Sequence, residues 1–262
     1  MKNVLENNIR EIVIRCNGRV SVAVELPSYS FHINGDSTYS AASLIKIPIL
    51  LEGFRQAQEG KISLSDRVTI PKEGRVGGAG VLVSLSDHLT LTVKDLLTLM
   101  IIVSDNTASN LLIERLGSNA IQDLCDTLQL KQTRLLRKLM DFEAVEQGLN
   151  NYTSALDILS CLKVLDIGKE YSPTSRKKML HILHQQQFDT KLPSRMDRGS
   201  VYIANKTGEL PGVEHDCAII KFREKTAYIA VLIDELGQNE PGKDTIAQIG
   251  KLMSDFLIKD NS

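Results

Sequence analysis

The stretch Ser43-Leu44-Ile45-Lys46 is the first of three short strings that decide how this chain folds and works. If Ser43 opens a helix, residues three apart share a face, so the ammonium of Lys46 lies beside the hydroxyl of Ser43. A serine hydroxyl is a poor nucleophile until a neighbouring base takes its proton. The string therefore predicts Ser43 as a nucleophile and Lys46 as its base, although alone it also fits an ordinary helix cap.

A lysine acts as a base near neutral pH only when its pKa falls well below the usual value of about 10.4. Burial lowers the pKa of a lysine, and so does a nearby positive charge, for which Lys206 is the candidate. The N–H groups in the first turn of a helix also stabilise negative charge. We therefore expect the N–H of Ser43 to form half of an oxyanion hole.

Two more strings follow in order, Ser104-Asp105-Asn106 and Lys206-Thr207-Gly208. Taken singly, the first fits loop capping and the second fits a charge on an edge strand. Ser43 and Ser104 are roughly 60 positions apart, and Ser104 and Lys206 are roughly 100 positions apart. The order and spacing of the three strings together predict an acyl-transfer site.

The composition is that of an ordinary globular protein. The 262 residues are 42% hydrophobic and 24% charged, with a formal net charge of −1 at pH 7. This near-neutral balance does not favour nucleic acid or an anionic membrane as a partner. We expect a small-molecule or peptide substrate, and the sequence leaves the oligomeric state open.

The first residues lack the apolar core of a signal peptide, and no segment is apolar for long enough to span a bilayer. As written, the chain is expected in the cytoplasm, although an exported chain whose leader had been removed would look similar. No metal or organic cofactor is implied. The cysteines lack metal-ligand spacing, which favours free packed thiols at Cys16, Cys125, Cys161 and Cys217.

Apolar periodicity outlines an α+β fold. It predicts helices over residues 4–13, 43–56, 92–103, 107–116, 119–128, 154–165 and 246–257, and strands over 21–26, 31–33, 202–206, 217–222 and 227–233. This order describes an antiparallel five-stranded sheet flanked by terminal helices, with an all-α lobe inserted between the second and third strands. We expect a single domain over residues 1–262, with an α/β lobe at about 1–40 and 200–262, an all-α lobe at about 41–199, and the site where the lobes meet.

The chain resembles the superfamily of class A β-lactamases and penicillin-binding proteins, whose signature strings are S-x-x-K, S-D-N and K-T-G. The similarity covers nearly the whole chain. The separations between the three strings also fit those of the class A members. Ala41-Ala42 before the nucleophile and Thr92–Leu97 before Ser104 add support, and Thr92 and Asp95 have the spacing of a capping box. The resemblance implies a serine β-lactamase/DD-peptidase-like fold and a hydrolase that works through an acyl-enzyme.

The resemblance also implies roles for the motif residues during acylation. Ser43 would be acylated, Lys46 would help to deprotonate it, and Ser104 would relay a proton to the leaving nitrogen.

Four further residues would bind the substrate in such an enzyme. Asn106 would hydrogen-bond the substrate amide, and the N–H of Glu209 would complete the oxyanion hole. Lys206 and Thr207 would hold the substrate carboxylate, for which an ammonium beside a hydroxyl is well suited.

The region that should supply the deacylating base departs from the family pattern. A class A β-lactamase uses a glutamate there to activate the water that hydrolyses the acyl-enzyme. In one alignment Glu146-Gln147-Gly148-Leu149-Asn150 matches the family's E-x-x-L-N, but the loop then loses several residues before Thr153-Ser154. In the other alignment, which needs no gap and which we favour, Leu139 stands where the glutamate belongs.

The string Arg137-Lys138-Leu139-Met140-Asp141 resembles one that several penicillin-binding-like relatives carry at this place. Leucine cannot accept a proton. Tyr152 replaces the aspartate that usually ties this loop to an arginine, so the loop must be held differently. Glu143 lies near the position of the family's water-holding asparagine and is a further candidate for a displaced base.

The leading interpretation is a serine hydrolase that acylates Ser43 readily, deacylates slowly towards β-lactams, and hydrolyses a natural amide, peptide or ester. The first alternative is an active class A β-lactamase that uses Glu146 or Glu143 as its base. The second is a non-catalytic penicillin-binding sensor module, which the lack of a membrane segment disfavours.

Overall fold

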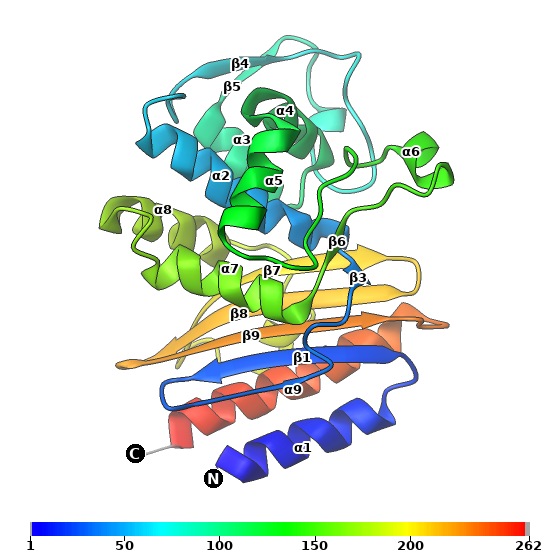
Figure 1. Cartoon of the computed structure of the whole chain (residues 1–262), viewed down its shortest axis with the longest axis vertical. Coiled ribbons are helices and arrows are strands. Elements are labelled where there is room, and N and C mark those ends of the chain that lie inside the picture. Colours follow the sequence, from blue (N-terminus) through cyan, green and yellow to red (C-terminus); the bar gives the residue numbers. More distant parts are fainter. Residues whose placement is uncertain (1, 260–262) are drawn as a thin grey trace.

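The central sheet joins segments from the two ends of the chain. In the computed structural model, which describes residues 2–259, the sheet has five strands in the order β2-β1-β9-β8-β7, and every neighbouring pair is antiparallel. The strands are β1 (Arg19–Leu26), β2 (Tyr29–Ile33), β7 (Tyr202–Leu210), β8 (Val213–Phe222) and β9 (Lys225–Asp234). The N-terminal hairpin therefore pairs with the C-terminal three strands through β1 and β9, as Figure 1 shows.

Both faces of this sheet are buried, because alternate side chains of a strand point to opposite faces. In β9, Ile229 and Val231 belong to one apolar cluster, while Ala230 and Leu232 belong to the other. The first cluster packs between the sheet and two terminal helices, α1 (Lys2–Arg15) and α9 (Asn239–Lys259), which lie side by side below the sheet in Figure 1.

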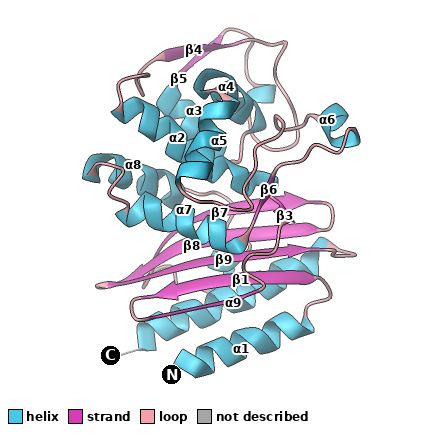
Figure 2. Ribbon diagram, in the orientation of Figure 1, coloured by secondary structure: helices cyan, strands magenta, loops and turns pink. Residues whose placement is uncertain are grey.

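The second cluster lies under the helical lobe, which covers the other face (Figure 2). The lobe contains η1 (Ala42–Ile45), α2 (Lys46–Gln58), η2 (Leu82–Ser84), α3 (Val93–Ile102), α4 (Asn106–Leu116), α5 (Ser118–Thr127), α6 (Phe142–Glu146), α7 (Ala155–Ile167) and α8 (Pro173–His184). Its short strands form two antiparallel two-stranded sheets, β4 (Arg67–Ile70) with β5 (Leu89–Thr92), and β3 (Tyr39–Ser40) with β6 (Tyr152–Thr153). The predicted α+β arrangement, with terminal helices on one face and an inserted helical lobe, is confirmed.

Local signals at the helix starts act as the sequence indicates. The Thr92 side chain accepts from the Asp95 N–H while the Asp95 carboxylate accepts from the Thr92 N–H, which completes the capping box of α3. The β4–β5 hairpin and α8 are not among the predicted elements. The α8 start carried a usable signal, since Ser172 caps it and Pro173 occupies the first turn.

One close contact joins α9 to the segment that leads into β7. A Cβ added at Gly250 would lie 2.2 Å from the carbonyl oxygen of Leu192, at the start of η3 (Leu192–Arg195). A backbone atom cannot move aside as a flexible side chain can, so only glycine fits there.

No helix within residues 2–259 is long and apolar enough to cross a membrane.

We expect Gly250→Ala to lower the free energy of unfolding by about 1–3 kcal/mol, because the added methyl overpacks this contact. Gly237→Ala is the matched control, since no atom lies within 4 Å of a Cβ there. Urea denaturation followed by circular dichroism measures both changes. Equal stability of the two variants would contradict the close approach of α9 and η3.

Candidate active site

Ser43 lies on a 3₁₀ turn, η1, that runs directly into α2 at Lys46. The sequence predicted an α-helix opening at Ser43; the 3₁₀ geometry keeps residues three apart on one face all the same. Ala42 just before it has φ +45°, a left-handed conformation that residues with a Cβ rarely adopt. Gly208 of β7 packs against this turn, since a Cβ there would lie 3.2 Å from the Ala42 Cβ. The sheet edge therefore approaches the predicted nucleophile closely.

Lys46 is fully buried beneath Ser43, and its three hydrogen bonds all go to the segment after α3. Its Nζ donates to the Ser104 carbonyl at 2.6 Å, to Ser104 Oγ at 3.1 Å and to Asn106 Oδ1 at 2.8 Å. The expected neighbour was the Ser43 hydroxyl, so the lysine turns further towards Ser104 than the spacing alone suggests. Burial lowers the pKa of Lys46 well below its usual value, and the charge of Lys206 lowers it further.

The hydroxyl of Ser104 lies between two buried lysines. It accepts a hydrogen bond from Lys46 Nζ and one from Lys206 Nζ, each at 3.1 Å. Burial lowers the pKa of Lys206 to about 7. Since a neutral lysine accepts a proton while a protonated one donates it, this group can move protons between the two lysines and Ser104.

Ser104 and its neighbours hold this position through backbone geometry. Ser104 has φ +54°, and Asp105 caps α4 by accepting from the Ala108 N–H at 2.9 Å. The second Asp105 oxygen accepts from the N–H groups of Val81 and Leu82, at 2.7 and 2.9 Å. The middle residue of the S-D-N string therefore anchors the loop that forms one pocket wall.

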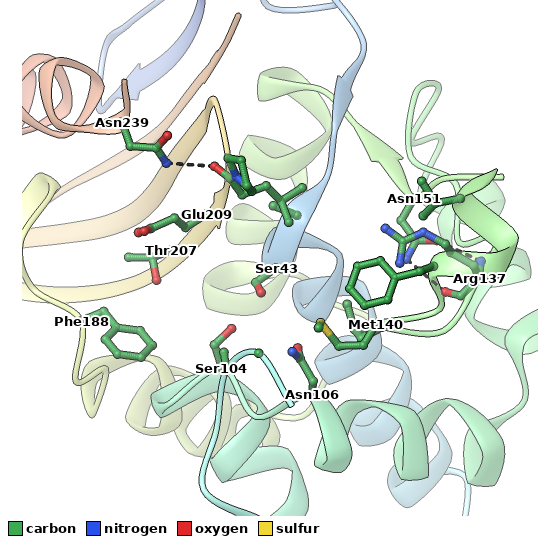
Figure 3. Close-up of a pocket in the computed structure, with 18 of the residues that line it drawn as sticks. Ser43, Ser104, Asn106, Arg137, Met140, Asn151, Phe188, Thr207, Glu209 and Asn239 are labelled. Carbon is green, nitrogen blue, oxygen red and sulfur yellow. Dashed lines mark hydrogen bonds between the residues drawn. The ribbon is translucent and has the colours of Figure 1, made fainter. Parts of the chain in front are cut away.

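A pocket of about 810 Å³ opens above these groups, and Figure 3 shows Ser43, Ser104 and Asn106 around its centre. Thr207 and Glu209 of β7 line one side of the cavity. Lys46 and Lys206 are buried behind it with no exposed surface. The three strings of the sequence thus meet in one place. Within residues 2–259, no group of three His, Cys, Asp or Glu side chains could hold a metal ion.

Lys191 is a pocket residue that the sequence analysis missed. Its Nζ donates to the Gly208 carbonyl at 2.8 Å and pairs with the buried carboxylate of Glu214 and, at 3.6 Å, with that of Glu209. It lies in a mixed polar stretch with no periodicity, so only the tertiary fold brings this second cation to the β7 edge of the pocket.

The loop before β6 places Leu139, not a glutamate, on the pocket wall. The side chain of Asn110 fixes Leu139 by accepting its N–H at 2.8 Å and donating to its carbonyl at 3.0 Å. Glu143 and Glu146 are exposed on α6 and are not among the residues that line the pocket.

The same loop is held without the aspartate that the family resemblance implied. Arg137 donates to the Asn150 side chain at 2.9 Å, and Asn151 accepts the Arg137 N–H at 3.1 Å. Asn150 and Asn151 in turn bond to Ser40 and Ala41, just before the nucleophile. Tyr152 contributes its backbone, which pairs with Arg134. Two consecutive asparagines therefore tie the loop to the Ser43 segment.

His215 of β8 holds the segment that leads to Ser43. Its ring is fully buried, and its Nε2 lies 2.8 Å from the carbonyl oxygen of Ser40, to which it donates. Burial lowers the pKa of His215 to about 4. Asp216 beside it is also fully buried, and burial raises the pKa of its carboxyl to about 7.

Between pH 6.5 and 4 the unfolded chain protonates His215 while the folded chain does not, so this residue lowers stability as the pH falls, by up to about 3 kcal/mol. Asp216 acts in the opposite sense, because the folded state keeps its proton to higher pH. We therefore expect His215→Asn to make the slope of unfolding free energy against pH less positive, and Asp216→Asn to make it more positive. Urea titrations across this range measure both slopes; unchanged slopes would contradict the buried, neutral histidine.

Comparison with known proteins agrees with this fold. The sequence profile described as the beta-lactamase enzyme family matches residues 3–257. Extended-spectrum beta-lactamase PER-1 of Pseudomonas aeruginosa is 23% identical over 98% of this chain and 88% of its own length.

Solved structures give the same result. The beta-lactamase from Sphaerobacter thermophilus DSM 20745 superposes with a TM-score of 0.87 and 28% identity, covering 95% of each chain. PBP-A superposes with a TM-score of 0.88 and 27% identity over 98% of this chain and 96% of that one, and a mutant of PBP-A was solved as an acyl-enzyme complex with penicillin-G. The chain therefore belongs to the beta-lactamase enzyme family, with the fold shared by class A β-lactamases and PBP-A.

Proposed function

We propose that this member of the β-lactamase family is a serine hydrolase that forms an acyl-enzyme at Ser43 and releases β-lactam-derived acyl groups slowly. The natural reaction would be hydrolysis of an amide, peptide or ester that carries a carboxylate. The placement of Leu139 on the pocket wall, with Glu143 and Glu146 outside the pocket lining, is the observation that carries this proposal.

In the acylation step, Ser43 Oγ attacks the substrate carbonyl carbon as neutral Lys46 takes the hydroxyl proton, directly or through Ser104. The new C–O bond forms, and the carbonyl electrons move to its oxygen, which the N–H groups of Ser43 and Glu209 would stabilise. The C–N or C–O bond to the leaving group then breaks. Ser104, bonded to both lysines, passes the proton to the leaving atom.

Substrate binding would use the two sides of the pocket. Lys206 is protonated below its pKa of about 7, and with Thr207 it would attract a substrate carboxylate. Lys191 adds a second cation at the same edge. Asn106, whose Nδ2 donates to the Gly77 carbonyl at 3.0 Å, would orient the substrate amide from the opposite side.

Deacylation needs a base that activates water near the acyl carbon. Of the described residues that line the pocket, Glu209 alone carries a carboxylate, and it lies within 3.6 Å of Lys191 and 3.5 Å of Lys243. These two ion pairs hold the Glu209 carboxylate beside the lysines and do not leave it free to bind a water at the acyl carbon. This supports a long-lived β-lactam acyl-enzyme.

The second candidate is an active β-lactamase in which a rearranged α6 brings Glu143 or Glu146 to the acyl group. It is favoured by the relatives, since PER-1 and the Sphaerobacter protein are both described as beta-lactamases.

Mixing the protein with excess chromogenic cephalosporin should release about one equivalent of product in a burst and then almost stop. Intact-mass spectrometry should show one covalent adduct, absent from Ser43→Ala. Steady turnover of many molecules per second, limited by chemistry, would rule out the slow-deacylation proposal and support the active β-lactamase.

Leu139→Glu should shorten the acyl-enzyme lifetime roughly 10- to 100-fold, because the Asn110 clamp holds the new carboxylate at the pocket wall. Leu139→Gln is the matched control, with a side chain of the same shape but no base. The lifetime is followed by the decay of the covalent adduct in intact-mass spectra. An equal lifetime in both variants would contradict the assignment of Leu139 to the base position.

A further inference from the structure

A set of apolar side chains lines one side of the pocket, and two of them are exposed. We define the α6 wall as Leu139, Met140, Phe142 and Val145, all of which line the cavity. Phe142 is 65% exposed and Val145 is 42% exposed, although both line the same pocket as Ser43 and Ser104. Single exposed apolar residues are common on protein surfaces, whereas a contiguous set inside a pocket marks a binding surface.

The wall is built on a small amphipathic helix. Phe142 and Val145 are three residues apart on α6 and therefore share a face, and that face is on the pocket. The two glutamates of the helix, Glu143 and Glu146, are exposed and lie outside the pocket lining. The helix thus turns its apolar side to the cavity and its charged side to solvent.

The wall is also fixed in place before any ligand binds. Met140 has φ +62°, a left-handed conformation that is unfavourable for a residue with a Cβ, and it turns the chain from Leu139 into α6. Asp141 caps the helix by accepting the Ala144 N–H at 3.0 Å. A Cβ at Gly78 would lie 2.8 Å from Met140 Sδ, so the opposite loop packs tightly on the wall. Such local strain points to a conformation retained for binding.

The position of the wall assigns it to one half of the substrate. In Figure 3, Thr207 and Glu209 lie on one side of Ser43, while Asn106 and Met140 lie on the other. A substrate whose carboxylate is held near Thr207 and whose carbonyl reaches Ser43 extends its acyl half towards the α6 wall.

Resting on the proposed acylation of Ser43, we propose that the natural substrate carries a bulky apolar group, aromatic or branched, on its acyl half, and that this group packs against the α6 wall. The wall then sets specificity, since burying Phe142 and Val145 against an apolar group removes their surface from water. A small or charged acyl group leaves that surface exposed and gains nothing from it.

Two penicillins that share one ring system test this. Benzylpenicillin carries a phenylacetyl group, and 6-aminopenicillanic acid carries a free amine in its place. Intact-mass spectrometry measures the second-order rate constant for acylation of Ser43 by each penicillin. The unaltered protein is compared with the double variant Phe142→Ser/Val145→Ser. We expect the rate with benzylpenicillin to fall about tenfold in the variant, and the rate with 6-aminopenicillanic acid to stay unchanged, which also reports an intact site.

The matched control is Leu149→Ser, because Leu149 belongs to the same loop, is 41% exposed and does not line the pocket. It should leave both rates unchanged. An equal fall with both penicillins in the double variant, or no fall with either, would overturn the role of the wall while leaving the proposed function standing.

Two other outcomes have separate meanings. If neither penicillin acylates the unaltered protein, the proposed function fails, and the wall loses its assigned substrate with it. If sedimentation shows that the protein self-associates, and the double variant abolishes this without changing the ratio of the two rates, the wall binds a second copy and the substrate proposal is wrong.

Discussion

The structure depends on one contact, the Ser104 hydroxyl held between the side-chain nitrogens of Lys46 and Lys206. The two lysines come from different layers, Lys46 from α2 of the helical lobe and Lys206 from β7 of the sheet. Burying two cations is costly unless polar groups surround them. The fold limits that cost with carbonyl, hydroxyl and amide oxygens, and the remaining penalty lowers both pKa values. The same buried contact therefore lowers the pKa values of both lysines and joins the helical lobe to the sheet.

Around this contact, polar side chains fix backbone segments instead of pairing with each other. Asp105 holds the N–H groups of Val81 and Leu82, Asn110 clamps Leu139, and His215 bonds the carbonyl of Ser40. Each of these side chains satisfies backbone N–H or C=O groups of a segment that borders the site. The pocket walls are therefore positioned by single residues, so one substitution such as leucine at position 139 can change the chemistry while the fold persists.

The fold was predictable because its signals are local. The apolar run of β9, the capping box of Thr92 and Asp95, and the periodicity of α9 can each be read from a short stretch of neighbouring residues. The β4–β5 hairpin carried too weak a signal, since each strand has four residues and a long irregular connection, residues 71–88, separates them. Lys191 had no signal at all, because its function depends on Gly208 and Glu214, which lie distant in the sequence but adjacent across the sheet edge.

By itself, the sequence determined the α+β architecture, the nucleophile Ser43 as a hypothesis, and the order of the three motif strings, because short-range spacing and apolar periodicity are written along the chain. The tertiary structure alone decided which neighbours those residues have. It turned Lys46 towards Ser104, placed Leu139 on the pocket wall with Glu143 and Glu146 outside it, and directed the apolar face of α6 into the cavity. These outcomes depend on how a loop folds against distant helices and strands, and no local pattern encodes that packing.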